Sequence, residues 1–146
     1  MGYQKVLVPV SGKYQLKRAA QTLEQALLIV REDGEICFLH CVEEVPCLIS
    51  GDAHKKLVME NAGEAEKLLQ PLTDRVKMAG IAHSVHILEG APAMLIPRFA
   101  SEAACNVVAM FSDGRNTLGK LFTGSVTERV LQKLSVPLLV VHPYAA

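Results

Sequence analysis

The chain has 146 residues, half of them apolar, and its 15 lysines and arginines balance its 15 aspartates and glutamates. This length suits one domain with a single core. A net charge of zero argues against the electrostatic attraction on which binding to nucleic acids or anionic membranes depends. No apolar run approaches the ~20 residues of a membrane-spanning helix, and the N-terminus lacks the design of a signal peptide. The four cysteines contain no C-x-x-C pair and are too few for a disulfide scaffold, so we expect a cytoplasmic protein.

The first half of the chain predicts two strands and two helices, in the order strand Lys5–Val10, helix Tyr14–Arg31, strand Glu35–Val42 and helix Asp52–Ala79. Both strands are nearly continuous apolar runs, which are typical of parallel strands buried on both faces. Both helices repeat apolar residues at the helical period. Asp33 and Gly34 are expected to end the first helix. Pro71 is expected to kink or divide the second helix, because proline removes a backbone hydrogen bond.

The second half predicts strand Ala82–Leu88, a helix from Pro92 to about Ala104, strand Val107–Phe111, a helix beginning at Ser125 and strand Pro137–His142. Pro92 suits the first turn of its helix, whereas Pro97 is expected to bend it. His40, His83 and His86 lie on predicted strands, but their spacing fits no zinc motif.

Strands and helices thus alternate along the whole chain as βαβαβαβαβ. This order predicts an α/β fold with a doubly wound, five-stranded parallel sheet and helices on both faces, since such crossovers are right-handed. Ligands of such sheets bind at the carboxyl ends of the strands, where the winding reverses. If the reversal lies between the first and fourth strands, residues Pro9–Gly12 converge with Phe111–Ser125. All 146 residues are therefore expected to form one domain with a ligand site at this edge.

Three interpretations of the glycine loop after Phe111 compete. Gly114 to Lys120 fits the P-loop pattern G-x-x-x-x-G-K, but Leu121 stands where a P-loop needs a hydroxyl for Mg²⁺, so we reject this interpretation. Gly114, nine residues, then Gly124 and Ser125 form the second half of the pattern G-x-x-G-x9-G-[ST], which would place backbone amides at a helix N-terminus around an anion. Alternatively, Gly124 and Ser125 only start the helix, through a capping box with Glu128.

Further segments extend the second interpretation over nearly the whole chain, namely Lys5–Val10 (KVLVPV), Phe38–His40 (FLH), Gly90–Pro92 (GAP), Gly124–Val130 (GSVTERV) and Val136–Val141 (VPLLVV). In this order and at this spacing, they resemble the universal stress protein family. The resemblance implies a Rossmann-like fold of the adenine nucleotide alpha hydrolase-like type. It also implies a small cytoplasmic stress-response protein that binds ATP, with or without Mg²⁺.

The same resemblance implies the binding residues. The adenine and ribose would be held by Pro9, Val10 and Ser11, with Cys41 and Met110 lining the base pocket. The phosphates would be held by Gly114, Gly124, Ser125 and Val126, and Arg115 or Lys120 would add positive charge. Glycine lets a ligand approach the backbone closely, and the amides after Gly124 head a helix. We expect no efficient catalysis, because no general base and no carboxylate pair for a metal are evident.

Two residues depart from the pattern of the family's nucleotide-binding members. Ser11 stands where they carry aspartate, and Phe111 stands where they carry glycine. The Phe111 ring could obstruct the cleft or stack on the base, and the two departures together predict ATP affinity no better than micromolar. Two alternatives therefore stay open, a dimeric adaptor that binds no nucleotide and a slow ATP hydrolase. A homodimer through the last strand, Pro137 to Val141, is expected with or without a ligand.

Overall fold

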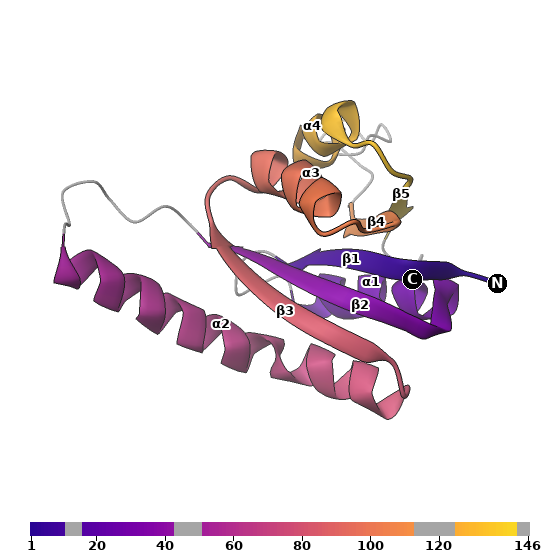
Figure 1. The fold of residues 1–146 in the computed structure, drawn as a ribbon, viewed down its shortest axis with the longest axis horizontal. Coiled ribbons are helices and arrows are strands. Elements are labelled where there is room, and N and C mark those ends of the chain that lie inside the picture. The colour runs from indigo at the N-terminus through magenta and orange to yellow at the C-terminus, as the bar shows by residue number, and fades with distance from the viewer. Residues whose placement is uncertain (11–15, 43–50, 113–124, 143–146) are drawn as a thin grey trace.

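The computed structural model describes residues 1–10, 16–42, 51–112 and 125–142, and for residues 52–62 and 125 it describes the backbone alone. Strands and helices alternate along the chain as expected (Figure 1). The elements are β1 (Tyr3–Val10), α1 (Leu16–Ile29), β2 (Val30–Val42), α2 (Asp52–Met78), β3 (Ala82–Glu89), α3 (Pro92–Glu102), β4 (Val107–Phe111), α4 (Ser125–Lys133) and β5 (Leu138–Val141).

The five strands form one parallel sheet in the order β3-β2-β1-β4-β5. Figure 1 shows α3 and α4 above the sheet and α2 below it, and α1 packs with α2 in one core on the same face. The predicted doubly wound α/β fold is therefore confirmed, with the winding reversing between β1 and β4. The carboxyl ends of β1 and β4 consequently lie side by side, each followed by a connection to a different face.

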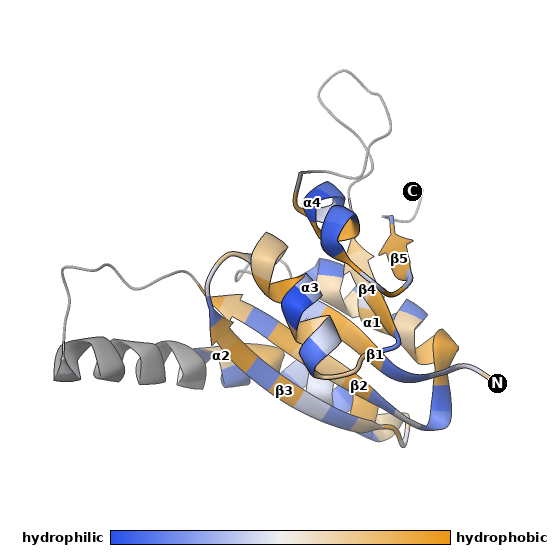
Figure 2. Cartoon of the chain, turned by 45° about the horizontal axis from the view of Figure 1, so that its top comes forward, coloured by the Kyte–Doolittle hydropathy of each residue, from blue (hydrophilic) through white to orange (hydrophobic). Residues whose placement is uncertain are grey.

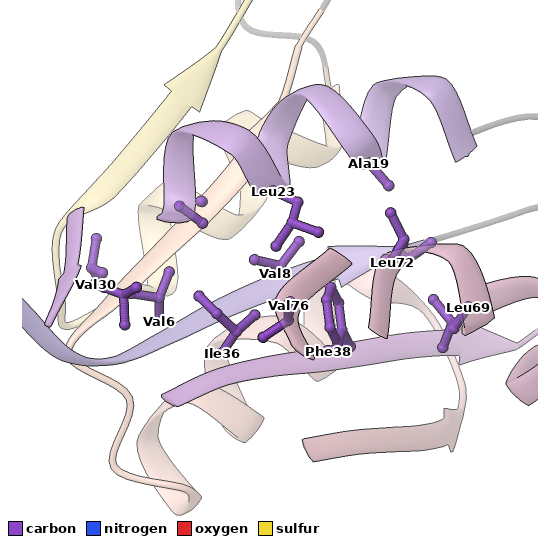
Figure 3. Close-up of a cluster of buried hydrophobic side chains, with 14 residues drawn as sticks. Val6, Val8, Ala19, Leu23, Val30, Ile36, Phe38, Leu69, Leu72 and Val76 are labelled. Carbon is purple, nitrogen blue, oxygen red and sulfur yellow. The ribbon is translucent and has the colours of Figure 1, made fainter. Parts of the chain in front are cut away.

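One hydrophobic core fills the space between the sheet and the lower helices. Alternate strand residues such as Val6, Val8 and Phe38 pack with Leu23 of α1 and Leu72 of α2 (Figure 3). Side chains on one face of a strand recur every second residue, whereas those on one face of a helix recur every third or fourth. Full burial of a side chain of this size stabilises the fold by about 1.5–3 kcal/mol.

A second core lies on the opposite face, under α3 and α4. Leu7, Leu39 and Val108 of the sheet pack there with Ile96 of α3 and Val130 of α4. Because β1, β2 and β4 are buried on both faces, they need the continuous apolar runs that the sequence shows, and Figure 2 shows these central strands as mostly hydrophobic.

The boundary between α1 and β2 differs from the expected one. The sequence predicts a helix to Arg31 ended by Asp33 and Gly34, but α1 ends at Ile29 and β2 begins at Val30. Val30 pairs with Tyr3 of β1, and the register shifts between Tyr3 and Lys5. Pairing with β1 therefore extends the strand through a segment whose local sequence favours a helix and its end.

Both prolines that the sequence predicts to disturb helices lie inside continuous helices. A kink at Pro71 and a bend at Pro97 stay predictions. Pro71 lies within α2 and Pro97 within α3, and neither divides its helix. In α2, Leu69, Leu72 and Val76 are buried on either side of Pro71, so packing on the sheet holds both parts in one helix. None of the helices in the described ranges is both long enough and apolar enough to cross a membrane.

Candidate functional site

A small pocket lies at the carboxyl edge of the sheet, where the winding reverses. It has a volume of about 70 Å³. It is lined by Pro9, Val10, Arg18, Ala19, Thr22, Cys41, Pro92, Ile96, Met110, Phe111 and Val126. These residues come from strands β1, β2 and β4, from α1 on one face and from α3 and α4 on the other. Parallel strands bring their carboxyl ends together, so the sheet itself assembles the pocket.

Five residues that the sequence singled out meet in this pocket, namely Pro9, Val10, Cys41, Met110 and Val126. That they hold a ligand stays a prediction. Ser11, Gly114, Arg115, Lys120 and Gly124 lie outside the described residues. The backbone of Ser125 begins α4, and its side chain is not described.

Sequence reasoning missed the pocket residues that α1 and α3 contribute. Arg18, Ala19 and Thr22 come from the start of α1, and Pro92 and Ile96 come from α3. Arg18 and Thr22 are separated by one helical turn, in the helix that directly follows β1. A search for polar residues at i and i+4 in that helix would have found them.

Phe111, the last residue of β4, forms part of the pocket wall. The Arg18 guanidinium carbon lies over its ring, 5.4 Å from the ring centroid. A cation over an aromatic face is attracted by the quadrupole of the ring. The ring of Phe111 therefore contacts a side chain of α1, and both side chains are half-buried.

His40 joins the two strands that form the floor of the site. Its side chain is buried, and its Nδ1–H donates to the carbonyl oxygen of Val10 at 3.0 Å. A carbonyl can only accept, so this contact assigns the proton to Nδ1. Burial lowers the pKa of His40, an effect that the hydrogen bond to Val10 opposes. A neutral imidazole thus ties the end of β1 to β2.

Cys41 supplies a neutral wall on the other side of the pocket. The thiol is buried, and burial raises its pKa to about 11. At neutral pH the side chain is therefore a protonated thiol, which behaves as a small apolar group. It suits a contact with the face of a heteroaromatic ring.

The described lining is thus mostly apolar with one cation. Such a wall fits an adenine ring, and the Arg18 guanidinium fits a phosphate oxygen. None of the described lining residues is a carboxylate that could hold Mg²⁺. The described parts of the chain also contain no group of three or more histidine, cysteine or acidic side chains with the geometry for a metal. The described lining therefore offers apolar contacts and one cationic group to a ligand.

Comparison with known proteins identifies the family. Residues 2–142 match the model of the universal stress protein family. The chain belongs to this family. It is 28% identical over 145 residues to universal stress protein MJ0531 of Methanocaldococcus jannaschii, an alignment that covers 95% of this chain and 82% of that protein.

Solved structures of the family share the fold. The structure of M. jannaschii protein MJ0577 superposes with a TM-score of 0.78 at 23% identity, covering all of both chains. A universal stress protein family protein from Arabidopsis thaliana with AMP bound gives a TM-score of 0.69 at 18% identity, covering 97% and 93% of the two chains. A universal stress protein in complex with cAMP gives 0.68 at 19% identity, covering 97% and 98%. Adenine nucleotides therefore bind to proteins of this family and fold.

Proposed function

We propose that this universal stress protein binds an adenine nucleotide at the carboxyl ends of β1 and β4 and acts as a regulatory module without efficient catalysis. The observation that carries the proposal is the pocket itself. Its described wall joins Pro9 and Val10 of β1 to Met110 of β4, with Cys41 on β2 and Val126 on α4. The AMP and cAMP complexes of related proteins support an adenine nucleotide as the ligand.

Within this proposal, the base contacts the apolar wall and the phosphates contact backbone amides. Gly114, Gly124, Ser125 and Val126 would supply the phosphate site, because the amides at the start of α4 point along the positive end of the helix dipole. ATP is the proposed nucleotide, and Arg115 or Lys120 would add charge-assisted contacts. Any Mg²⁺ would be held mainly by the phosphates and water, as is common for this ion.

The two alternatives differ in their ligand chemistry. An adaptor of the same fold would act without a nucleotide. It is favoured by Phe111, which fills space at the end of β4 where the family pattern has glycine. A slow hydrolase would bind ATP and release ADP over time. Mass spectrometry of the gently purified protein detects any bound adenine nucleotide and so distinguishes a nucleotide-binding protein from the adaptor. Incubation with ATP then distinguishes the regulatory module from the slow hydrolase, because only the hydrolase forms ADP.

Calorimetric titration of Gly124→Asp tests the proposed phosphate site. A carboxylate at this position would repel the phosphates and block the approach to the backbone, so we expect ATP binding to be lost and the fold to be kept. Wild type should bind with a dissociation constant of about 1 μM or weaker, near −8.2 kcal/mol. Gly63→Asp is the matched control, because a side chain at Gly63 on α2 meets nothing within 4 Å. Equal ATP affinity in Gly124→Asp and wild type would contradict the assignment.

A further inference from the structure

Arg18 is the only charged side chain among the described residues of the pocket. The other polar side chain of the lining, apart from the Cys41 thiol, is Thr22. The Thr22 hydroxyl is buried and donates to the backbone carbonyl of Arg18 at 3.0 Å. The described pocket can therefore distinguish a charged ligand from a neutral one mainly through Arg18.

The surroundings of Arg18 favour an anion. The residue lies in the first turn of α1, next to Lys17, and this turn as described contains no acidic residue. The positive end of a helix dipole destabilises cations, so two cations at this end raise the local positive potential. A bound anion would gain attraction from both the Arg18 side chain and the positive end of the helix.

Phe111 holds the Arg18 guanidinium at the pocket wall. The guanidinium carbon lies 5.4 Å from the ring centroid. The contact keeps the guanidinium group, with its five N–H donors, beside the pocket wall. The contact with the ring also restricts a long side chain that would otherwise lose more conformational entropy on binding.

We infer that Arg18, carried on the ring of Phe111, makes this pocket select the phosphorylated form of its nucleoside over the neutral form. The inference rests on the proposed nucleotide binding and adds the residue that recognises the phosphate charge. The apolar wall binds adenosine and AMP alike, because both carry the same base and ribose. Arg18 contacts the phosphate that AMP alone carries.

Calorimetric titration of the full chain with adenosine and with AMP tests this inference. Wild type should bind AMP about tenfold to a hundredfold more tightly than adenosine, the range for one charge-assisted contact. Arg18→Gln should lower AMP affinity by a similar factor and leave adenosine affinity unchanged. Arg18→Lys keeps the charge but loses the planar fork, so its AMP affinity should fall between the two. Lys77→Gln is the matched control, since it removes one exposed charge from α2 and does not line the pocket.

Phe111→Leu separately tests whether the Phe111 ring supports Arg18. It keeps an apolar wall and removes the aromatic face, so it should reduce AMP affinity several-fold and spare adenosine. Equal losses for adenosine and AMP would mean that the ring contacts the base, and would overturn its role as a platform for Arg18.

The failures of the inference and of the proposed function are distinguishable. Equal affinity of wild type for adenosine and AMP, or an equal loss of both ligands in Arg18→Gln, would overturn the inference while nucleotide binding stands. A wild type that binds neither adenosine, AMP nor ATP would overturn the proposed function and the inference together. Circular dichroism of each variant confirms that a loss of binding is not a loss of fold.

Discussion

A single buried histidine connects the end of β1 with β2. His40 is 7% exposed and donates from Nδ1 to the Val10 carbonyl oxygen at 3.0 Å. Val10 lines the pocket, so this hydrogen bond helps to fix the backbone at the site. A charged imidazole would be costly in this position, and burial accordingly lowers the pKa of His40 from its ordinary value of 6.5.

This histidine makes the stability of the fold depend on pH. Below pH 6.5 the unfolded chain protonates His40 before the folded chain does, so the unfolded state binds more protons. The stability that the neutral His40 contributes to the fold is therefore complete above pH 6.5. It is lost as the pH falls toward the lowered pKa of His40 in the folded protein, and the free energy of unfolding changes by at most about 1.4 kcal/mol per pH unit. His40→Asn keeps an N–H donor near the position of Nδ1 and removes the titration.

Urea denaturation of both proteins between about pH 5 and 7.5 checks this expectation. The free energy of unfolding of wild type should fall more steeply toward acid than that of His40→Asn. Identical pH dependence in the two proteins would show that His40 does not titrate in this range.

At the scale of elements, the approach between β1 and the first part of β2 depends on one glycine. A Cβ atom added at Gly34 would lie 2.8 Å from the carbonyl oxygen of Gln4 and 2.9 Å from Cγ2 of Val30. Gln4 also donates from its side chain to the carbonyl oxygen of Asp33 at 3.1 Å. Gly34 therefore allows close backbone contact inside the sheet, a role different from the helix end that the sequence predicts.

We expect opposite effects from the same substitution at two glycines. Gly34→Ala should destabilise the fold by about 1–3 kcal/mol, because the neighbouring backbone has to move. Gly63→Ala should stabilise it by about 0.5–1 kcal/mol, because Gly63 lies in α2 with open space around the added Cβ atom and alanine favours a helix. Thermal and urea denaturation of the two variants measure both changes. A neutral Gly34→Ala would mean that β1 and β2 adapt to the added methyl group.

At the scale of the whole molecule, β5 is an edge strand of the sheet, paired with β4 on one side. It is hydrophobic along its length (Figure 2). Its side chains differ in their surroundings within one protomer. Leu138 and Leu139 pack against the two cores and Val141 is only 6% exposed, whereas Val140 is half-buried and belongs to neither core cluster. Of these residues, Val140 is the best placed to contact a second copy.

The predicted homodimer through Pro137–Val141 is therefore best tested at Val140. An unpaired apolar edge favours association, and a lysine there opposes it by adding charge. Light scattering at micromolar concentration should give a dimer for wild type and a monomer for Val140→Lys. Val141→Lys is a poorer test, since it buries a charge within the protomer. Met78→Lys, at an 85% exposed site on α2, is the matched control and should stay dimeric. A monomeric wild type would contradict the prediction.

The sequence alone determined the elements, their order and the family. Continuous apolar runs marked the strands, helical periods marked the helices, and the right-handed crossover rule turned their order into a doubly wound sheet. Pro9 and Val10 could be placed at the ligand edge because they end β1 and strand ends converge in such a sheet, whereas Cys41 and Met110 were implied by the resemblance to the family. These features depend on local patterns and on a general rule of chain topology.

Only the tertiary structure decided where β2 begins, whether α2 stays in one piece and which helix residues line the pocket. The start of β2 at Val30 follows from pairing with β1, which overrides a local preference for helix. Pro71 stays within one helix because side chains on either side of it are buried against the sheet. The contact of Arg18 with Phe111 joins residues from α1 and β4 that lie far apart in the sequence. A local pattern reports the period of its own element, whereas contacts of this kind exist only after the helices have packed on the assembled sheet.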